Sequence, residues 1–272
     1  MFRFIAFLFV FMPVTFQAQA AENNFQPSQC MAIARALPNK FQPVVIQAAF
    51  SFGTASKEEE VTIRYAGHST YVIETPKGVR IATDFSGFYG TDPLPRVITM
   101  NKAHSSHFTS APDPGIEHVL RGWDPSGAPA KHALVVDDVY IRNVTTDIRA
   151  MGAMEADGNS IFIFEVADLC IGHLGHLHHM LDDSDYGAIG RLDIVMVPVD
   201  GGLTLSGKGM ADIVNRLQSS IVLPMHRRFT DVETFLSNVK GLFDVRYAGS
   251  DTIKVSLRTL PRTPTILVPD GL

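Results

Sequence analysis

The second half of the chain alternates apolar strands with helices, and this rhythm constrains the fold more than any other feature. Residues 192–199 are apolar except for Asp193, and residues 221–224 are a continuous apolar run. Helical patterns follow them at residues 205–217 and 232–239. A strand that is apolar on both faces needs a covering layer on each side. The pattern therefore predicts an α/β protein whose sheet has helices on one face and another sheet or helix layer on the other.

The first half is rich in short strands. Residues 61–65 alternate apolar and polar side chains, as a half-buried strand does. Residues 109–131 are rich in Pro, Gly and Asp and predict a long loop, interrupted by a short helix at residues 116–121. Further strands are expected at residues 69–74, 79–84, 97–100, 133–136, 139–144, 160–166, 168–173, 243–248, 252–256 and 265–268, with a turn at residues 157–159. We expect one domain with two β-rich halves and helices outside.

Composition excludes several classes of protein. The 272 residues carry a formal net charge of −5 and are 46% hydrophobic, which excludes an intrinsically disordered chain. A sequence pI of about 6.0 argues against a nucleic-acid partner, which would require a basic face. Two cysteines cannot build a disulfide-rich scaffold or a four-thiolate zinc site.

The first twenty residues have the pattern of a secretory signal. Arg3 gives a basic start, residues 4–12 are an apolar run, and Ala18-Gln19-Ala20 fits a cleavage site. The alternative is an uncleaved N-terminal anchor. We expect a signal peptide at residues 1–20, a lead-in segment at residues 21–56 and the main domain at residues 57–272. The mature protein should be exported, to a periplasm, without stable membrane insertion.

The two cysteines leave two alternatives. In an oxidising compartment Cys30 and Cys170 can form a disulfide. Cys170 lies in the apolar stretch of residues 161–171, where a buried free cysteine is common. This setting favours the free thiol.

The histidines gather at three strand ends. Seven of the ten are the last residue of a predicted strand or lie in the loop that follows it: His104, His107, His173, His176, His178, His179 and His226. A sheet holds such residues rigidly while leaving them accessible to ligands. Neutral imidazole is a common ligand of Zn²⁺, Mn²⁺ and Fe, and a catalytic site needs about three protein ligands and an open position. We expect side chains from the three strand ends, namely His107, His173 and His226, to converge on one metal.

A series of short motifs in chain order resembles the metallo-β-lactamase-fold hydrolases over roughly residues 61–228. The motifs are Gly67-His68-Ser69-Thr70, Thr83-Asp84, the histidine segment at residues 104–107, His173-Leu174-Gly175, residues 193–198 with Gly201-Gly202, and Pro224-Met225-His226. The chain looks most like the branch of ascorbate-6-phosphate lactonase-like and N-acyl-phosphatidylethanolamine phospholipase D-like proteins. The resemblance implies a four-layer αβ/βα sandwich with a metal site at one edge between the two sheets.

The chain departs from the metal motif of that family. The family pattern His-x-His-x-Asp-His reads Ser105-Ser106-His107-Phe108-Thr109-Ser110 in this sequence. His176 stands where the family has a bridging aspartate. We expect His104 and His176 to replace lost ligands. Because a neutral imidazole holds a second cation less well than a carboxylate does, one metal is favoured over two.

These features predict an exported metal-dependent hydrolase that uses a metal-activated water on an ester, lactone, amide or phosphoester. The expected ligands are His104, His107, His173, His176 and His226, and Zn²⁺ is the expected metal, with Mn²⁺ or Fe as alternatives. Asp84 is the expected auxiliary carboxylate or base, and His68 orients a ligand or caps its turn. The partner is a small-molecule substrate of open identity, and the oligomeric state is open. The alternatives are a periplasmic metal-binding protein and a non-catalytic member with a vestigial site.

Overall fold

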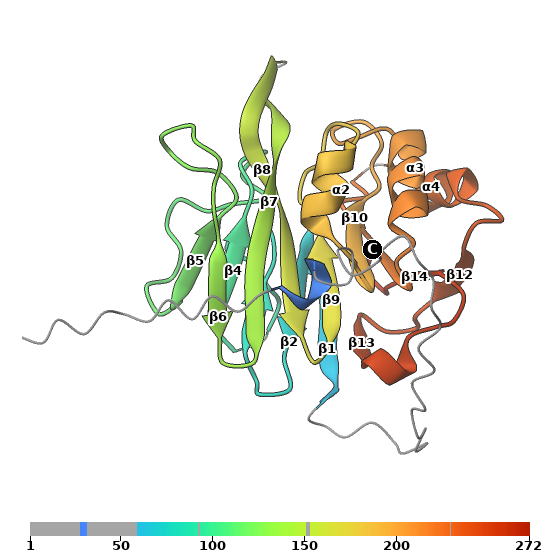
Figure 1. Cartoon of the computed structure of the whole chain (residues 1–272), viewed down its shortest axis with the longest axis horizontal. Helices are drawn as coiled ribbons and strands as arrows, with labels where there is room; N and C mark the ends of the chain where they lie inside the picture. Colours follow the sequence, from blue (N-terminus) through green and yellow to red (C-terminus); the bar gives the residue numbers. More distant parts are fainter. Residues whose placement is uncertain (1–27, 32–58, 92, 151–152, 229) are drawn as a thin grey trace, which may run out of the picture.

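The computed structural model describes residues 28–31, 59–91, 93–150, 153–228 and 230–272, and two sheets form its centre (Figure 1). The first sheet has six strands in the order β13 (Thr252–Val255), β1 (Val61–Gly67), β2 (Thr70–Glu74), β3 (Arg80–Ala82), β4 (Val97–Met100) and β5 (His118–Arg121). The second has eight in the order β12 (Asp244–Tyr247), β14 (Thr265–Val268), β11 (Ile221–Met225), β10 (Ile194–Pro198), β9 (Leu169–His173), β8 (Ala153–Val166), β7 (Val139–Ala150) and β6 (Ala133–Val136).

Strands β9, β10 and β11 pair in parallel at the centre of the second sheet. Every residue of these three strands is buried, as their continuous apolar sequences require. Three helices accompany this sheet: α2 (Asp183–Ile189), α3 (Gly207–Leu217) and α4 (Val232–Asn238). Each begins after a polar N-cap residue that accepts backbone N–H groups, namely Asp182, Ser206 and Asp231.

Three apolar clusters separate the layers. Ile213, Val214 and Phe235 of the helices pack with the second sheet in one cluster. Ile63 and Ile73 of the first sheet meet Phe162 and Met196 of the second in another, so the two sheets are stacked face to face. On the outer face of the first sheet, loop residues cover the strands, among them Phe85, Tyr89, Phe108, Ile116 and Trp123. This arrangement confirms the α/β sandwich.

Two local predictions were wrong. The segment expected as a helix at residues 116–121 is strand β5, which pairs in parallel with β4 from His118 onwards. A helix this short gains little from its own hydrogen bonds, whereas the edge of β4 supplies a full ladder. The expected turn at residues 157–159 lies within the long strand β8, where the register against β7 shifts and Asp157 has φ 54°. Helix α2 was not predicted.

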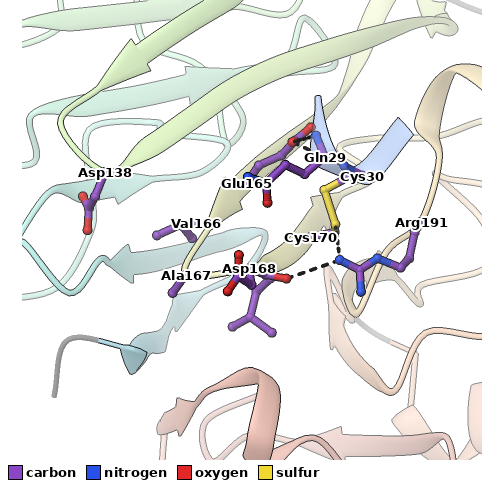
Figure 2. Close-up of a pocket in the computed structure, with 10 residues that line it drawn as sticks. Gln29, Cys30, Asp138, Glu165, Val166, Ala167, Asp168, Cys170 and Arg191 are labelled. Carbon is purple, nitrogen blue, oxygen red and sulfur yellow. Dashed lines mark hydrogen bonds between the residues drawn. A yellow bond between two sulfur atoms is a disulfide. The ribbon is translucent and has the colours of Figure 1, made fainter. Parts of the chain in front are cut away.

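Cys30 and Cys170 form a disulfide, so the expectation of a free buried thiol was wrong. Glu165 holds the N-terminal segment in place, because its carboxylate accepts hydrogen bonds from Ser28 Oγ and from the backbone N–H of Gln29. A pocket of about 160 Å³ adjoins the disulfide (Figure 2). There Arg191 lies over Cys170, with Nη2 3.2 Å from Sγ. The two cysteines are 140 residues apart in sequence, so only the fold brings them together.

No helix within the described ranges is both long and apolar enough to cross a membrane. The predicted signal peptide at residues 1–20 and most of the lead-in segment at residues 21–56 lie outside the described residues. Their boundaries stay predictions.

Candidate metal centre

Five histidines converge where strand ends of the two sheets meet. His68 lies in the turn between β1 and β2, and His104 and His107 follow β4. His176 follows β9, and His226 follows β11. The backbone N–H of His226 donates to the carbonyl of His68 over 2.7 Å, which ties the two sheets together at this point.

Four of these side chains form a compact group with metal-ligand geometry. His68, His104, His107 and His226 each offer a ring nitrogen, and these atoms lie within 4.8 Å of one another. His176 borders the group, because its ring centroid is 4.6 Å from that of His107 and 4.8 Å from that of His226.

The buried ring nitrogens point to a ligand. The Nε2 atoms of His104, His107, His176 and His226 are buried and have no hydrogen-bond partner among the described residues. Burying a polar atom without a partner is costly, and native structures rarely leave several such atoms together. His104, His107 and His226 belong to both sets, the compact group and the unpartnered nitrogens. Their Nε2 atoms are therefore the first candidates for metal ligands.

Asp84 orients His107. The Asp84 carboxylate is fully buried, and Oδ2 lies 2.7 Å from His107 Nδ1. Asn101 Nδ2 donates to Oδ1 over 2.7 Å. Burial alone would raise the pKa of Asp84, but His107, His173 and the hydrogen bonds from His107 and Asn101 hold the pKa below its ordinary value. The ionised carboxylate accepts a hydrogen bond from the Nδ1–H group of His107, so His107 Nε2 carries a free lone pair.

Asp200 plays the same part for His226. Its Oδ1 lies 3.1 Å from His226 Nδ1, and its carboxylate also accepts from Thr204 Oγ1 and from the backbone N–H of Leu203. Although burial opposes ionisation, the hydrogen bonds from His226, Thr204 and Leu203 lower the pKa of Asp200. His226 has φ 53°, a conformation that is uncommon for a non-glycine residue and that recurs at functional sites.

Ser106 links His68 and His104. Its Oγ lies 2.8 Å from His68 Nε2 and 2.7 Å from His104 Nδ1. Burial and the neighbouring histidines lower the pKa of His68 to about 3 and that of His104 to about 4, so both rings are neutral near pH 7. When His104 Nδ1 donates to Ser106, its Nε2 presents a lone pair to the group.

His173 stands apart from the group. Its Nδ1 accepts from the backbone N–H of Gly175 over 3.1 Å, and its Nε2 lies 2.9 Å from the carbonyl of Ser69. Both ring nitrogens thus have protein partners. Of the three histidines expected to converge, the structure brings His107 and His226 together, with ring centroids 4.9 Å apart.

Sequence reasoning did not single out Asn101, Ser106 or Asn159. Asn101 holds Asp84, and Asn159 Oδ1 accepts the backbone N–H of His176 over 2.8 Å. Gly175 lies against both asparagines, and with φ +61° a Cβ there would come within 2.4 Å of each. A signal existed only for Ser106, which is flanked by the histidines of one motif.

The chain belongs to the family described as beta-lactamase superfamily domain, whose model matches residues 62–226, more than half of the sequence. A metal-dependent hydrolase of Thermoplasma volcanium is 23% identical over 201 residues, which cover 64% of this chain and 86% of that protein. The fold and the resemblance seen in the sequence motifs thus agree on the metallo-β-lactamase class.

Solved structures share the fold. One is a protein of Thermotoga maritima described as a zinc-dependent hydrolase of the metallo-β-lactamase superfamily, with a TM-score of 0.54, 22% identity, and coverage of 77% of this chain and 98% of that chain. Another is a metallo hydrolase of Ignicoccus hospitalis, with a TM-score of 0.53, 17% identity, and coverage of 72% and 99%. At these identities the likeness shows the fold alone.

Proposed function

We propose that this protein is a metal-dependent hydrolase that holds one metal ion through His104, His107 and His226. The observation that carries the proposal is the set of buried, unpartnered Nε2 atoms of these three histidines within one compact group. Three imidazoles are the number of protein ligands that a catalytic zinc site uses. The described relatives of Thermoplasma and Thermotoga are named as metal-dependent and zinc-dependent hydrolases, which supports the same conclusion.

The donor set fits Zn²⁺, with Mn²⁺ or Fe as alternatives, because neutral imidazole binds all of these ions. A bound ion of this kind supplies an activated water and polarises the oxygen of an ester, lactone, amide or phosphoester. A single ion is favoured, because the compact group consists of four histidines and contains no carboxylate to hold a second cation.

The carboxylates act through the histidines. Both oxygens of Asp84 accept hydrogen bonds, one from His107 and one from Asn101, so Asp84 positions His107. Asp200 positions His226 in the same way. Such partners fix the tautomer and orientation of a ligand ring and raise its basicity. We therefore assign Asp84 a positioning role in place of the expected role as auxiliary carboxylate or base. His68 is connected to the ligand His104 through Ser106.

A small-molecule substrate can approach beside Asp200. A pocket of about 270 Å³ is lined by Asp200, Gly202, Leu203, Arg228 and Thr230. Asp200 also lies 3.1 Å from Nδ1 of His226. The pocket therefore adjoins the histidine group, and we assign it to the substrate.

We also propose export to an oxidising compartment. The apolar run and Ala18-Gln19-Ala20 predict a cleaved signal. The disulfide between Cys30 and Cys170 supports the proposal, because structural disulfides are rare in reducing compartments. The intact mass of protein from its native host tests it. A mature chain that retains residues 1–20 would refute cleavage.

Metal content and hydrolysis test the main proposal. Protein purified without a histidine tag should contain about one equivalent of metal and cleave a chromogenic ester or phosphodiester in a panel. His107→Ala and His226→Ala should abolish both metal binding and hydrolysis. His118→Ala is the matched control, because His118 lies on edge strand β5 and should leave both unchanged. Folded wild-type protein that binds no divalent metal would refute the proposal.

The alternative is a metal-binding protein without hydrolysis. The observation in its favour is that Asp84 and Asp200 both accept hydrogen bonds from histidines instead of belonging to the compact group. Metal-loaded protein that is inactive on esters, lactones, amides and phosphoesters would favour this alternative.

A further inference from the structure

The tautomer of His178 is fixed by the backbone. Its Nδ1 lies 2.5 Å from the backbone N of Arg149, whose N–H donates to it. A ring nitrogen that accepts a hydrogen bond carries no proton, so the proton of His178 is on Nε2. That Nε2 lies 2.6 Å from the carbonyl of Leu203 and 2.9 Å from His176 Nδ1.

The tautomer of His176 follows from that of His178. Because His178 Nε2 carries a proton, a second proton on His176 Nδ1 would place two N–H groups head to head at 2.9 Å. His176 Nδ1 is therefore the acceptor of this contact. A neutral imidazole has one proton, so the proton of His176 is on Nε2.

The ring that carries this N–H borders the histidine group. The His176 side chain is buried, and its Nε2 has no partner among the described residues. The His104 ring centroid is 5.1 Å from that of His176, and those of His107 and His226 are closer. Asn159 fixes the backbone of His176. A donor is thus held rigidly beside the candidate ligands.

The unpartnered Nε2 atom of His176 differs chemically from those of His107 and His226. In those two residues Nδ1–H donates a hydrogen bond to a carboxylate, so Nε2 carries a lone pair. In His176 another histidine donates to Nδ1, so Nε2 is an N–H. A metal ligand must present a lone pair, and a group that stabilises an anionic oxygen must present a donor.

We propose that His176 is a hydrogen-bond donor of the active site and not a metal ligand, and that its Nε2–H holds an anionic oxygen of the substrate beside the metal. This proposal rests on the proposed function, because the anionic oxygen belongs to the substrate of the hydrolase. It gives His176 a catalytic role different from the ligand role that the sequence suggested. A donor aimed at developing negative charge in a buried site favours the transition state over the substrate.

Nitrogen NMR on the unmodified chain tests the tautomer directly. Protein labelled with ¹⁵N-histidine should show His176 protonated on Nε2 in both the metal-free and the ¹¹³Cd-loaded forms. Coupling between ¹¹³Cd and ¹⁵N should appear for Nε2 of His107 and His226 and be absent for His176. The His176→Gln spectrum assigns the signal. Cadmium coupling to His176, or protonation of its Nδ1, would overturn the proposal.

Anion binding tests the role with cobalt and azide as probes. His176→Leu should leave Co²⁺ affinity within about threefold of wild type and weaken azide binding to the Co²⁺-loaded protein about tenfold, as loss of one hydrogen bond to a charged group predicts. His107→Leu should lose Co²⁺, and His118→Leu should change neither affinity. A His176→Leu protein that loses Co²⁺ as His107→Leu does, or that binds azide as wild type does, would overturn the proposal. Wild-type protein that binds no metal would refute the proposed function, whereas the tautomer in the metal-free protein would still decide the assignment of His176.

Discussion

At the residue scale, the hydrogen-bond partner of Nδ1 determines whether the Nε2 atom of a histidine is a lone pair or a donor. His107 and His226 have carboxylates behind them, His176 has another histidine, and His173 has backbone groups on both sides. Four rings of the same residue type thus acquire three chemical characters. Experiments should therefore change the residue that contacts Nδ1 of each histidine.

Asp84→Asn should weaken zinc binding about 10- to 100-fold, because the amide removes the charge that holds the proton on His107 Nδ1. Isothermal titration of the metal-free protein measures the change. Asp113→Asn, in an exposed loop, is the matched control and should bind zinc as wild type does. Equal affinity in the two variants would contradict a role for Asp84 behind His107.

The partly buried His68 and His104 predict acid sensitivity of the metal-free protein. The pKa values of His68 and His104, about 3 and about 4 in the folded chain, lie below their ordinary value of 6.5. The unfolded chain therefore binds more protons below pH 6.5, and the free energy of unfolding falls as the pH falls. The melting temperature should decline from pH 6.5 to pH 4.5, and His104→Gln should flatten the decline. A constant wild-type melting temperature over this range would contradict the prediction.

Sequence reasoning found the metal-ligand candidates but could not rank them. His104, His107 and His226 were predicted as ligands because they follow strands. The same argument predicted His173. His173 differs because both of its ring nitrogens have hydrogen-bond partners, in the backbone of Gly175 and Ser69. These contacts depend on the conformation of the loops. The tautomer of His176 depends on Arg149, 27 positions away in the chain, and no local pattern encodes that contact.

At the element scale, strands with strong local patterns were predictable and segments stabilised by neighbours were not. Strands β4, β6 and β14 have the predicted bounds. Strand β5 forms because it pairs with the edge of β4. The sequence of its four residues does not by itself predict a strand. The disulfide likewise depends on where the segment at residues 28–31 lies.

Reduction of the disulfide should lower stability. Removing a native disulfide costs roughly 2–5 kcal/mol, and the loop closed between Cys30 and Cys170 is long. Dithiothreitol should therefore lower the melting temperature of wild-type protein. A variant with both Cys30→Ala and Cys170→Ala should melt at the reduced temperature and be insensitive to dithiothreitol. Equal melting of oxidised and reduced wild type would contradict a stabilising disulfide.

At the scale of the whole molecule, the order of strands and helices predicted a layered α/β protein, because each apolar strand needs a covering layer on both faces. The resemblance of the motifs to a known family predicted the sandwich. The motifs identified the superfamily, and the particular branch stays a prediction. The layer outside the first sheet was less predictable, since loop residues such as Phe108 and Trp123 build it within the described chain.

Metal should stabilise the whole molecule. A ligand that binds only the folded state adds about 2.7 kcal/mol at a concentration one hundred times its Kd. Zinc should therefore raise the melting temperature of wild-type protein, with a titration endpoint near one equivalent, and a chelator should reverse the shift. His226→Ala should show no shift. An endpoint at two equivalents of equal affinity would contradict a single site.

The hydrogen bond between His226 and His68 has a consequence for the order of events in biosynthesis. His68, His104 and His107 come from the first sheet, whereas His226 follows a strand of the second sheet and appears more than one hundred residues later in the chain. A nascent polypeptide lacks a complete ligand set until both sheets have formed and closed on each other. With the proposed ligands, metal binding would therefore be a late step that follows the closure of the two sheets.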